Sequence, residues 1–209
     1  MGFTGFTAKD FQVFAMPDFA GRMGAIRLKI QPKLMTLAEE MAPDFRRVVG
    51  AEIFAHVAKH MRRSVNPPGD TWVAFGPDKR GYKKTQHFKV AISRHCVRFL
   101  FEIGPEYATK TKWSRTWQAQ IDPLIPNLQR VKGLGWFKNE HDEDPAAELK
   151  DMAPDQIRDL AKELTRRKDG QLVLGRRVVQ GEAIDLASTA LEKEALALFA
   201  GLLPLYRLS

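Results

Sequence analysis

The 209-residue sequence lacks several features that would narrow its function. A single cysteine, Cys96, excludes an intrachain disulfide and a cysteine-rich zinc site, and it favours a reducing compartment, so we expect the cytoplasm. The apolar run Leu196 to Tyr206 near the C-terminus has 11 residues and contains Pro204, whereas a membrane span needs roughly 20. The N-terminal MGFTGFTAKDFQVF has neither the basic nor the apolar region of a secretory signal. We therefore expect no membrane partner.

The motifs of common enzyme classes are also missing. There is no Walker A loop and no G-x-G-x-x-G sequence, so the ordinary nucleotide-binding folds are excluded and no cofactor is predicted. Cys96, His95 and Ser64 stand in no recognisable nucleophile motif and are interpreted as structural. The sequence names no reaction, and whether the protein is an enzyme stays open.

The positive charge is concentrated in one stretch. Residues 56–94 hold nine Lys and Arg and two Asp, a local charge of +7 in a chain whose total is +8, and they contain three of the five histidines. Such a patch attracts anions, although a basic surface also simply keeps a protein in solution. This stretch is the candidate functional region.

Hydrophobic periodicity predicts helices at both ends of the chain. The first begins after Thr7, and a second pattern over residues 21–45 has Pro32 as a kink or break. A third helix is predicted over residues 51–63, ended by the sequence NPPGD. Later helices begin near Pro154 and end before Pro204.

Alternating residues predict the strands. A short strand is expected at 71–75, a hairpin is expected from 88–92 and 97–103, and weaker strands lie in LGWFKNEH and QLVLGRRVV, the second bulged at Gly175. The acidic NEHDEDPAAE is predicted to be a long loop. Hairpins with helices before and after them indicate an α+β fold, a largely antiparallel sheet covered by helices, in a single domain over residues 1–209.

The stretch HVAKHMRRSVNPPGDTWVAFGPDKRGYKKTQHF resembles the YktB-like family of bacterial proteins along nearly its whole length. The resemblance is weaker in the N-terminal helices and the closing PLYRLS, and weakest over residues 105–185. It implies an α+β fold with helices packed on a sheet, mostly in Gram-positive bacteria, without a secretion signal or an established activity. Gln86 departs from the family, because a proline is expected before His87.

A metal site is one interpretation of the histidines. On the predicted helix, His56 and His60 are four residues apart on one face, as in metal-binding pairs, with Asp70 or His87 as a third ligand. However, the glutamate of an H-E-x-x-H motif is missing, because Val57 follows His56. We therefore predict no metal.

A site for a small anionic ligand, bearing phosphate or carboxylate, is the preferred prediction. Arginine offers a planar fork suited to both groups, and two basic segments could converge on one cleft. The simpler interpretation is that Arg63 pairs with Asp70 and the lysines face water. The predicted ligand-binding residues are His56, His60, Arg62, Arg63, Asn66, Asp70, Trp72, Lys79, Arg80, Tyr82, Lys83 and His87.

Nucleic acid is the alternative partner, bound by the basic 56–94 surface. The segment YATKTKWSRTWQ supports it by interleaving aromatic and basic residues, but Trp113 and Trp117 also have the spacing of a buried helical stripe. A second alternative is an enzyme acting on an anionic substrate in the same cleft, with His56, His60 or His87 as acid or base.

Overall fold

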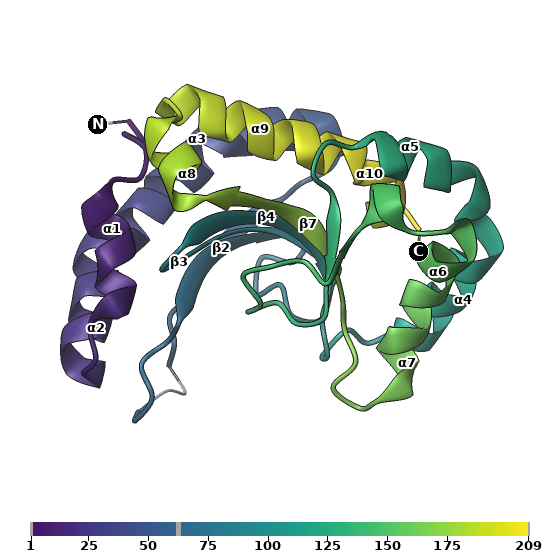
Figure 1. Ribbon diagram of the computed structural model, residues 1–209, viewed down its shortest axis with the longest axis horizontal. Coiled ribbons are helices and arrows are strands. Elements are labelled where there is room, and N and C mark those ends of the chain that lie inside the picture. The colour runs from purple at the N-terminus through teal and green to yellow at the C-terminus, as the bar shows by residue number, and fades with distance from the viewer. Residues whose placement is uncertain (1, 62–63, 209) are drawn as a thin grey trace.

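A computed structural model describes residues 2–61 and 64–208, and it consists of one antiparallel sheet with helices on one face and at both ends (Figure 1). The sheet has seven strands in the order β1-β2-β3-β4-β7-β5-β6, and every pair is antiparallel. The strands are β1 Phe54–Val57, β2 Asp70–Gly76, β3 His87–Ser93, β4 Cys96–Ile103, β5 Gly135–Phe137, β6 Ala147–Glu148 and β7 Leu172–Val179. The predicted α+β class is confirmed.

The helices fall before, between and after the strands. The α-helices are α1 Ala8–Gln12, α2 Phe19–Ala25, α3 Gln31–Val49, α4 Lys110–Gln120, α5 Ile125–Arg130, α6 Pro154–Asp159, α7 Glu163–Arg166, α8 Gln180–Asp185, α9 Ser188–Gly201 and α10 Leu203–Tyr206. A π-helical segment, Ile26–Ile30, joins α2 to α3, and short 3-10 turns cover Val13–Ala15, Asp122–Leu124, Leu149–Asp151 and Leu160–Lys162.

One face of the sheet carries the hydrophobic core. Alternate residues of β2, β3 and β4 point to this face, and α3 and α9 cover it (Figure 1). At its centre the Phe45 ring of α3 lies 5.3 Å from the rings of Phe75, Phe88 and Phe199. Core packing of this kind places α3 and α9 over the strands and leaves the opposite face for other contacts.

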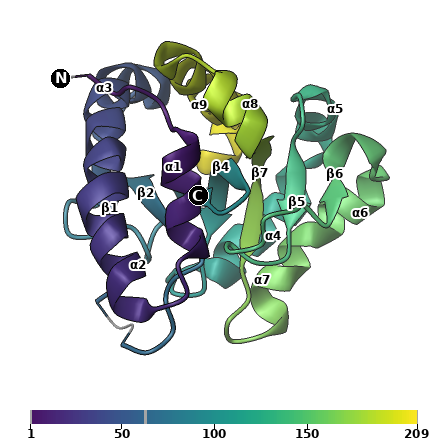
Figure 2. The ribbon, with the colours of Figure 1, turned by 60° about the vertical axis from the view of Figure 1, so that its left-hand side comes forward.

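The ends of the sheet are covered by different helices. The N-terminal helices α1 and α2 lie at one end, and the group α4, α5, α6 and α7 lies at the other, as the two views agree (Figures 1 and 2). Trp113 and Trp117 of α4 are buried in this second group, with ring centroids 5.4 Å apart. Those two tryptophans are therefore core residues and are not available to stack on nucleic-acid bases.

The prediction of a helix over residues 51–63 was wrong. Gly50, which has a φ of 75°, ends α3 in a left-handed conformation, and the chain then forms strand β1 against β2. Phe54 and Val57 suit a strand as well as a helix, so the pattern alone was ambiguous, and the backbone hydrogen bonds of the β1 and β2 pair decide the outcome. His60 follows with a φ of 50°, which is uncommon for a residue other than glycine.

The predicted bulge at Gly175 was also wrong. The pairing of β4 with β7 is continuous, and Gly175 lies opposite Leu100 on one side and Gly135 on the other. A Cβ atom at Gly175 would lie 2.2 Å from the carbonyl oxygen of Phe99. The glycine is therefore required by the close approach of β4 and not by an extra residue in the strand.

Several local predictions are confirmed. The hairpin of β3 and β4, the strand β2, the helix start at Pro154 and the loop rich in acidic residues after β5 all occur as expected. At Pro32 the helical residues are not interrupted: a π-helical segment, Ile26–Ile30, stands directly before α3, and Pro32 is the second residue of that helix, where its missing N–H is tolerated.

Candidate functional site

The second face of the sheet is polar where the first is apolar. Because side chains alternate across a strand, the residues between the core positions of β2, β3 and β4 all point to this side. They include an unusual number of buried charged or polar groups: Asp70, His87, Lys89, Ser93, Arg98 and Glu102. Buried charges are rare in proteins unless they are paired, so this face demands an explanation beyond packing.

A cavity of about 480 Å³ lies against this polar face. Four segments form its walls: the chain after β1, the loop between β2 and β3, the chain after β4, and the loop between β5 and β6. Its lining residues are Ala58, Lys59, His60, Met61, Trp72, Tyr82, Lys83, His87, Lys89, Glu102, Gly104, Pro105, Glu106, Glu140 and His141. The volume is that of a site for a small molecule.

Arg98 of β4 holds one wall of the cavity together from beneath. Its side chain is wholly buried, and its Nη2 donates to Oδ2 of Asp70 at 2.6 Å. Its Nη1 donates to the backbone oxygens of Glu140 and Asp142, each at 2.7 Å. These two carbonyls flank His141, so one cation fixes both the carboxylate on β2 and the loop that carries the histidine.

His141 connects this buried pair to the cavity. Its Nδ1 lies 3.0 Å from Oδ1 and 3.1 Å from Oδ2 of Asp70, and its ring centroid lies 5.7 Å from that of Trp72. The side chain is 41% exposed and lines the cavity. A histidine whose one nitrogen is held by a buried carboxylate has its tautomer and orientation fixed, which leaves Nε2 for another partner.

A second buried network surrounds Lys89 of β3. Its ammonium forms ion pairs with Glu102 of the adjacent strand and with Glu140 of the β5–β6 loop. His87 lies beside them, with Nε2 3.3 Å from Oε2 of Glu102 and Nδ1 2.8 Å from the backbone oxygen of Thr85. The floor of the cavity is thus a cation between two carboxylates.

Aromatic rings form the wall above this network. The indole nitrogen of Trp72 donates to the hydroxyl oxygen of Tyr82 at 2.9 Å, and the ring of Tyr82 lies 4.8 Å from that of His87. Nζ of Lys89 lies 4.9 Å from the centroid of Trp72 and 5.7 Å from that of Tyr82, within the range of cation–π attraction. Planar rings that line a cavity give a ligand a surface for stacking.

The pKa values of Asp70 and His141 follow from these contacts. Burial raises the pKa of Asp70, but the hydrogen bond from His141 and the charge of Arg98 together lower it by more. The pKa of Asp70 therefore lies below its ordinary value. The hydrogen bond to Asp70 raises the pKa of His141, and burial opposes that rise only in part. His141 is therefore more readily protonated than an ordinary histidine.

Lys89 and Glu102 keep their charges although both are buried. Burial lowers the pKa of Lys89, but Glu102 and Glu140 raise it well above its ordinary value. Burial likewise raises the pKa of Glu102, whereas Lys89 and His87 lower it by more, so the carboxylate stays ionised. Burial raises the pKa of Tyr82, which remains a neutral phenol.

Buried ion pairs of this kind are a weak source of stability. The desolvation of each ion costs several kcal/mol, and apolar residues of the same volume often stabilise a fold as well or better. Two such networks beside one cavity, with strongly shifted pKa values, are the combination that marks functional sites. The structure therefore directs attention to this cavity.

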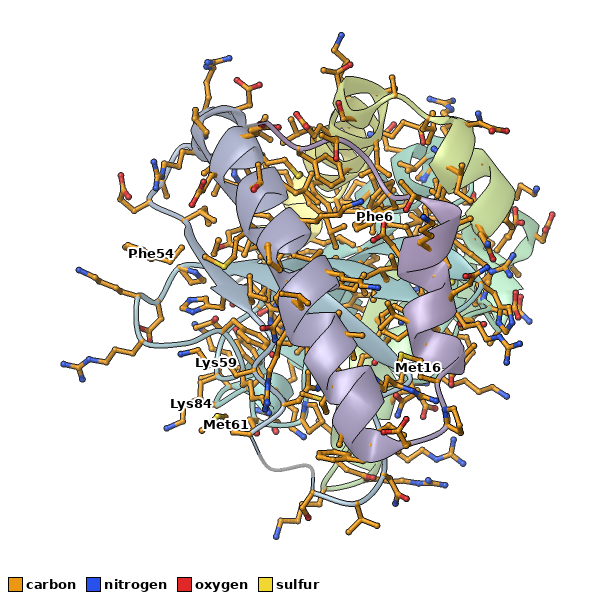
Figure 3. The ribbon with its side chains drawn as sticks, turned by 90° about the vertical axis from the view of Figure 1, so that its left-hand side faces the viewer. Phe6, Met16, Phe54, Lys59, Met61 and Lys84 are labelled. Atoms are coloured by element: carbon orange, nitrogen blue, oxygen red, sulfur yellow. The ribbon has the colours of Figure 1, made fainter. Side chains whose placement is uncertain are left out.

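The charge of the cavity differs from that of its surroundings. Among its lining residues, Lys59, Lys83 and Lys89 are matched in number by Glu102, Glu106 and Glu140. The excess positive charge lies outside, on the loop that supplies Tyr82 and Lys83, where Lys79, Arg80 and Lys84 are exposed. In the view of Figure 3, Lys59, Met61 and Lys84 lie in one region below Phe54.

Five of the predicted ligand-binding residues line the cavity: His60, Trp72, Tyr82, Lys83 and His87. Asp70 lies behind it and acts through His141. Asn66, Lys79 and Arg80 are exposed and do not line it. Arg62 and Arg63 lie outside the described residues. Residues 58–61 after β1 line the same cavity as Tyr82 and Lys83 of the β2–β3 loop. The predicted convergence of the basic segment 62–66 with the 79–87 loop is not decided by this, because Arg62 and Arg63 lie outside the described residues.

The geometry proposed for a metal-binding histidine pair was wrong. His56 belongs to a strand and His60 to the turn after it, so they do not share a helix face. Nε2 of His56 contacts the backbone oxygen of Asp78 at 2.9 Å, whereas Nε2 of His60 contacts Oγ1 of Thr71 at 3.0 Å. Within residues 2–61 and 64–208, no three His, Cys, Asp or Glu side chains are grouped to hold a metal.

The simpler interpretation, in which Arg63 pairs with Asp70, lies outside the described residues; the described partners of Asp70 are His141 and Arg98. Both carboxylate oxygens of Asp70 contact His141, and Oδ2 also accepts from Arg98. Sequence reasoning missed Lys89, Arg98, Glu102, Glu140 and His141 as site residues. Lys89, Arg98 and Glu102 could have been found, because each is a charged residue between apolar positions of a predicted strand.

A second cavity, of about 400 Å³, lies between the β5–β6 loop and the segment after α7. It is lined in part by Trp136, Arg166 and Arg167. Arg166 is engaged with Glu163 at 3.1 Å on the surface, and no buried ion network adjoins this cavity in the described part of the chain. It is a weaker candidate.

No helix among the described residues is long and apolar enough to cross a membrane.

Together these features define an α+β protein with a helix-covered antiparallel sheet and a polar cavity on the other face. The family model described as "Domain of unknown function (DUF1054)" matches residues 6–206. The chain belongs to this family, as the resemblance to YktB-like proteins predicted.

Bacterial relatives carry the name UPF0637. One from Bacillus velezensis is 33% identical over 181 residues, which cover 87% of this chain and 85% of the relative. One from Oceanobacillus iheyensis is 32% identical and covers 98% of this chain and 96% of its own length. One from Lactiplantibacillus plantarum is 33% identical, with coverage of 97% and 94%. None of these names states an activity.

Proposed function

We propose that the protein binds a small anionic molecule, bearing phosphate or carboxylate, in the cavity on the polar face of the sheet. The observation that carries the proposal is a cavity of about 480 Å³ where aromatic walls stand over two buried ion networks. An enclosed aromatic surface with a few oriented polar groups is the usual design of a small-molecule site.

The position of the charges supports an anion as the ligand. Lys59 and Lys83 line the cavity, and Lys79, Arg80 and Lys84 are exposed on the loop that supplies Lys83, so this side of the protein carries a positive field that concentrates anions. The buried floor, one ammonium between two carboxylates, carries a net negative charge, so it does not by itself attract an anion. The anionic group is therefore expected near the rim, with the uncharged part of the ligand against Trp72.

A melting screen over nucleotides, sugar phosphates and carboxylates tests this proposal. A ligand that binds only the folded state stabilises it by about 2.7 kcal/mol at one hundred times its Kd. Lys83→Ala is expected to weaken that stabilisation, whereas Lys84→Ala, the adjacent exposed lysine that does not line the cavity, is the matched control. A screen in which no compound raises the melting temperature would count against the function.

The other two functions would give different results. Nucleic-acid binding now depends on the basic 56–94 surface alone, because Trp113 and Trp117 are buried. It predicts equal losses from Lys83→Ala and Lys84→Ala and a steep fall of affinity with salt. An enzyme acting on an anionic substrate would use the same cavity, and ligand binding is the step that both share.

A further inference from the structure

The fixed ring of His141 is the most specific feature of the cavity. Asp70 holds its Nδ1 from one side, and Arg98 holds the backbone of its loop from the other, through the carbonyls of Glu140 and Asp142. Within residues 2–61 and 64–208, Nε2 of His141 has no hydrogen-bond partner in the protein. Two buried groups thus orient a half-exposed ring whose second nitrogen remains unused.

We propose that His141 is the anion-binding group of the cavity, whose imidazolium donates from Nε2 to an oxygen of a tetrahedral oxyanion such as a phosphate group. This proposal rests on the proposed function and adds that binding of the anion is coupled to protonation of His141. Asp70 and Arg98 are positioning residues that act through His141.

Two other cations of the cavity, Lys89 and Lys83, are less suited to this role. Lys89 is engaged by two carboxylates at once, so an anion would have to compete with both. Lys83 is exposed and lies 3.5 Å from Glu106, which reduces its attraction for a further anion. A protonated His141 pairs with Asp70 through Nδ1 and still offers a second donor, because an imidazolium has two N–H groups.

The charged groups around His141 decide when it is protonated. Asp70 of β2 and Glu140 of its own loop favour the imidazolium, and Lys89 of β3 opposes it. The hydrogen bond to Asp70 is the largest of these effects, so the pKa of His141 lies above its ordinary value. A bound oxyanion would add a further negative charge beside Nε2 and raise that pKa again.

The test uses sulfate, whose double charge does not change between mildly acidic and mildly alkaline solution. Sulfate is titrated into isotopically labelled protein at about pH 6 and about pH 9, on either side of the ordinary histidine range. Sodium chloride at matched ionic strength is the control for screening. The ring resonances of His141 are followed, and the affinity is obtained for the wild type and for His141→Gln.

We expect sulfate to move the His141 resonances and to bind about tenfold or more tightly at the lower pH, as the loss of one charged hydrogen bond implies. In His141→Gln both the affinity and its pH dependence should fall. His95→Gln removes an exposed histidine that does not line the cavity and should behave as wild type. His141→Gln is expected to fold, because Arg98 continues to pair with Asp70.

Three results would overturn the inference: no binding of sulfate at the lower pH, equal affinity at both pH values, or equal binding by the wild type and His141→Gln. None of them is the failure of the proposed function. A compound from the melting screen that stabilises the wild type and His141→Gln equally would retain the ligand site and reject the role of His141.

Discussion

The guanidinium of Arg98 and the carboxylate of Asp70 form a hydrogen-bonded ion pair of 2.6 Å in which both side chains are almost completely buried. They lie on strands that are not adjacent, because β3 separates β2 from β4. The pair therefore crosses the polar face of the sheet and connects its strands to the β5–β6 loop. Its removal should affect both stability and the cavity.

Arg98→Met should lower the free energy of unfolding by about 3–5 kcal/mol, because it leaves a buried carboxylate and two carbonyls without their donor. Urea denaturation measures this loss. Arg94→Met, at an exposed arginine in the turn after β3, is the control and should change stability by about 0.5 kcal/mol or less. A loss below about 1 kcal/mol for Arg98→Met would show that the pair does not hold the wall.

Lys89→Met should destabilise the protein by a similar amount, about 3–5 kcal/mol, since Glu102 would remain buried without its main ion-pair partner. The double variant Lys89→Met with Glu102→Gln should recover part of that loss. The three variants form a double-mutant cycle measured by urea denaturation. Additive losses would contradict a coupled pair.

The titration of His141 should have its midpoint above the ordinary histidine value of about 6.5. Protonated His141 stabilises the fold fully below its unfolded pKa, and that contribution is lost as the pH rises through the folded pKa. Asp70→Asn should lower the midpoint, because the hydrogen bond to a carboxylate is its main cause. NMR of the ring protons measures the midpoint, and an unchanged value in Asp70→Asn would refute this cause.

A separate pH effect is expected where α3 and α9 meet. Burial and the neighbouring Glu40 raise the pKa of Glu192 to about 7. The folded state thus binds more protons than the unfolded chain between the ordinary pKa of about 4.5 and about 7, so stability should fall as the pH rises through that window.

Glu192→Gln should remove this fall and stabilise the protein at alkaline pH by up to about 1 kcal/mol, since the two carboxylates are partly solvated. Glu39→Gln removes the same charge from an exposed neighbouring position and is the control. Melting temperatures across the pH range compare the two. If both variants keep the wild-type slope, the carboxylate pair is not its cause.

Much of the fold could be predicted from local sequence pattern. Alternation gave the β3 and β4 hairpin, because Phe88, Val90 and Ile92 can be buried together only on one face of a strand. The four residues of β1 could not be assigned in this way, because a run so short fits both periods and only its pairing with β2 selects the strand.

The candidate site was predictable in part. Trp72, Tyr82 and His87 come from one continuous stretch whose composition attracted attention. Arg98 and Glu102 were visible as polar residues between the apolar positions of a predicted strand. His141 could not be found, since it lies more than 70 residues from Asp70 in sequence and nothing local shows that the acidic loop folds back over the sheet.

The four tryptophans provide the most direct test of the central claim, that the ligand binds against Trp72. Each indole N–H gives one NMR signal; Trp72 lines the proposed site, Trp136 lines the second cavity, and Trp113 and Trp117 are buried in the core. A compound that raises the melting temperature should shift the Trp72 signal, because its N–H donates to Tyr82 within the cavity wall, and should leave the other three in place. A stabilising compound that shifts Trp136 and leaves Trp72 unchanged would contradict the account.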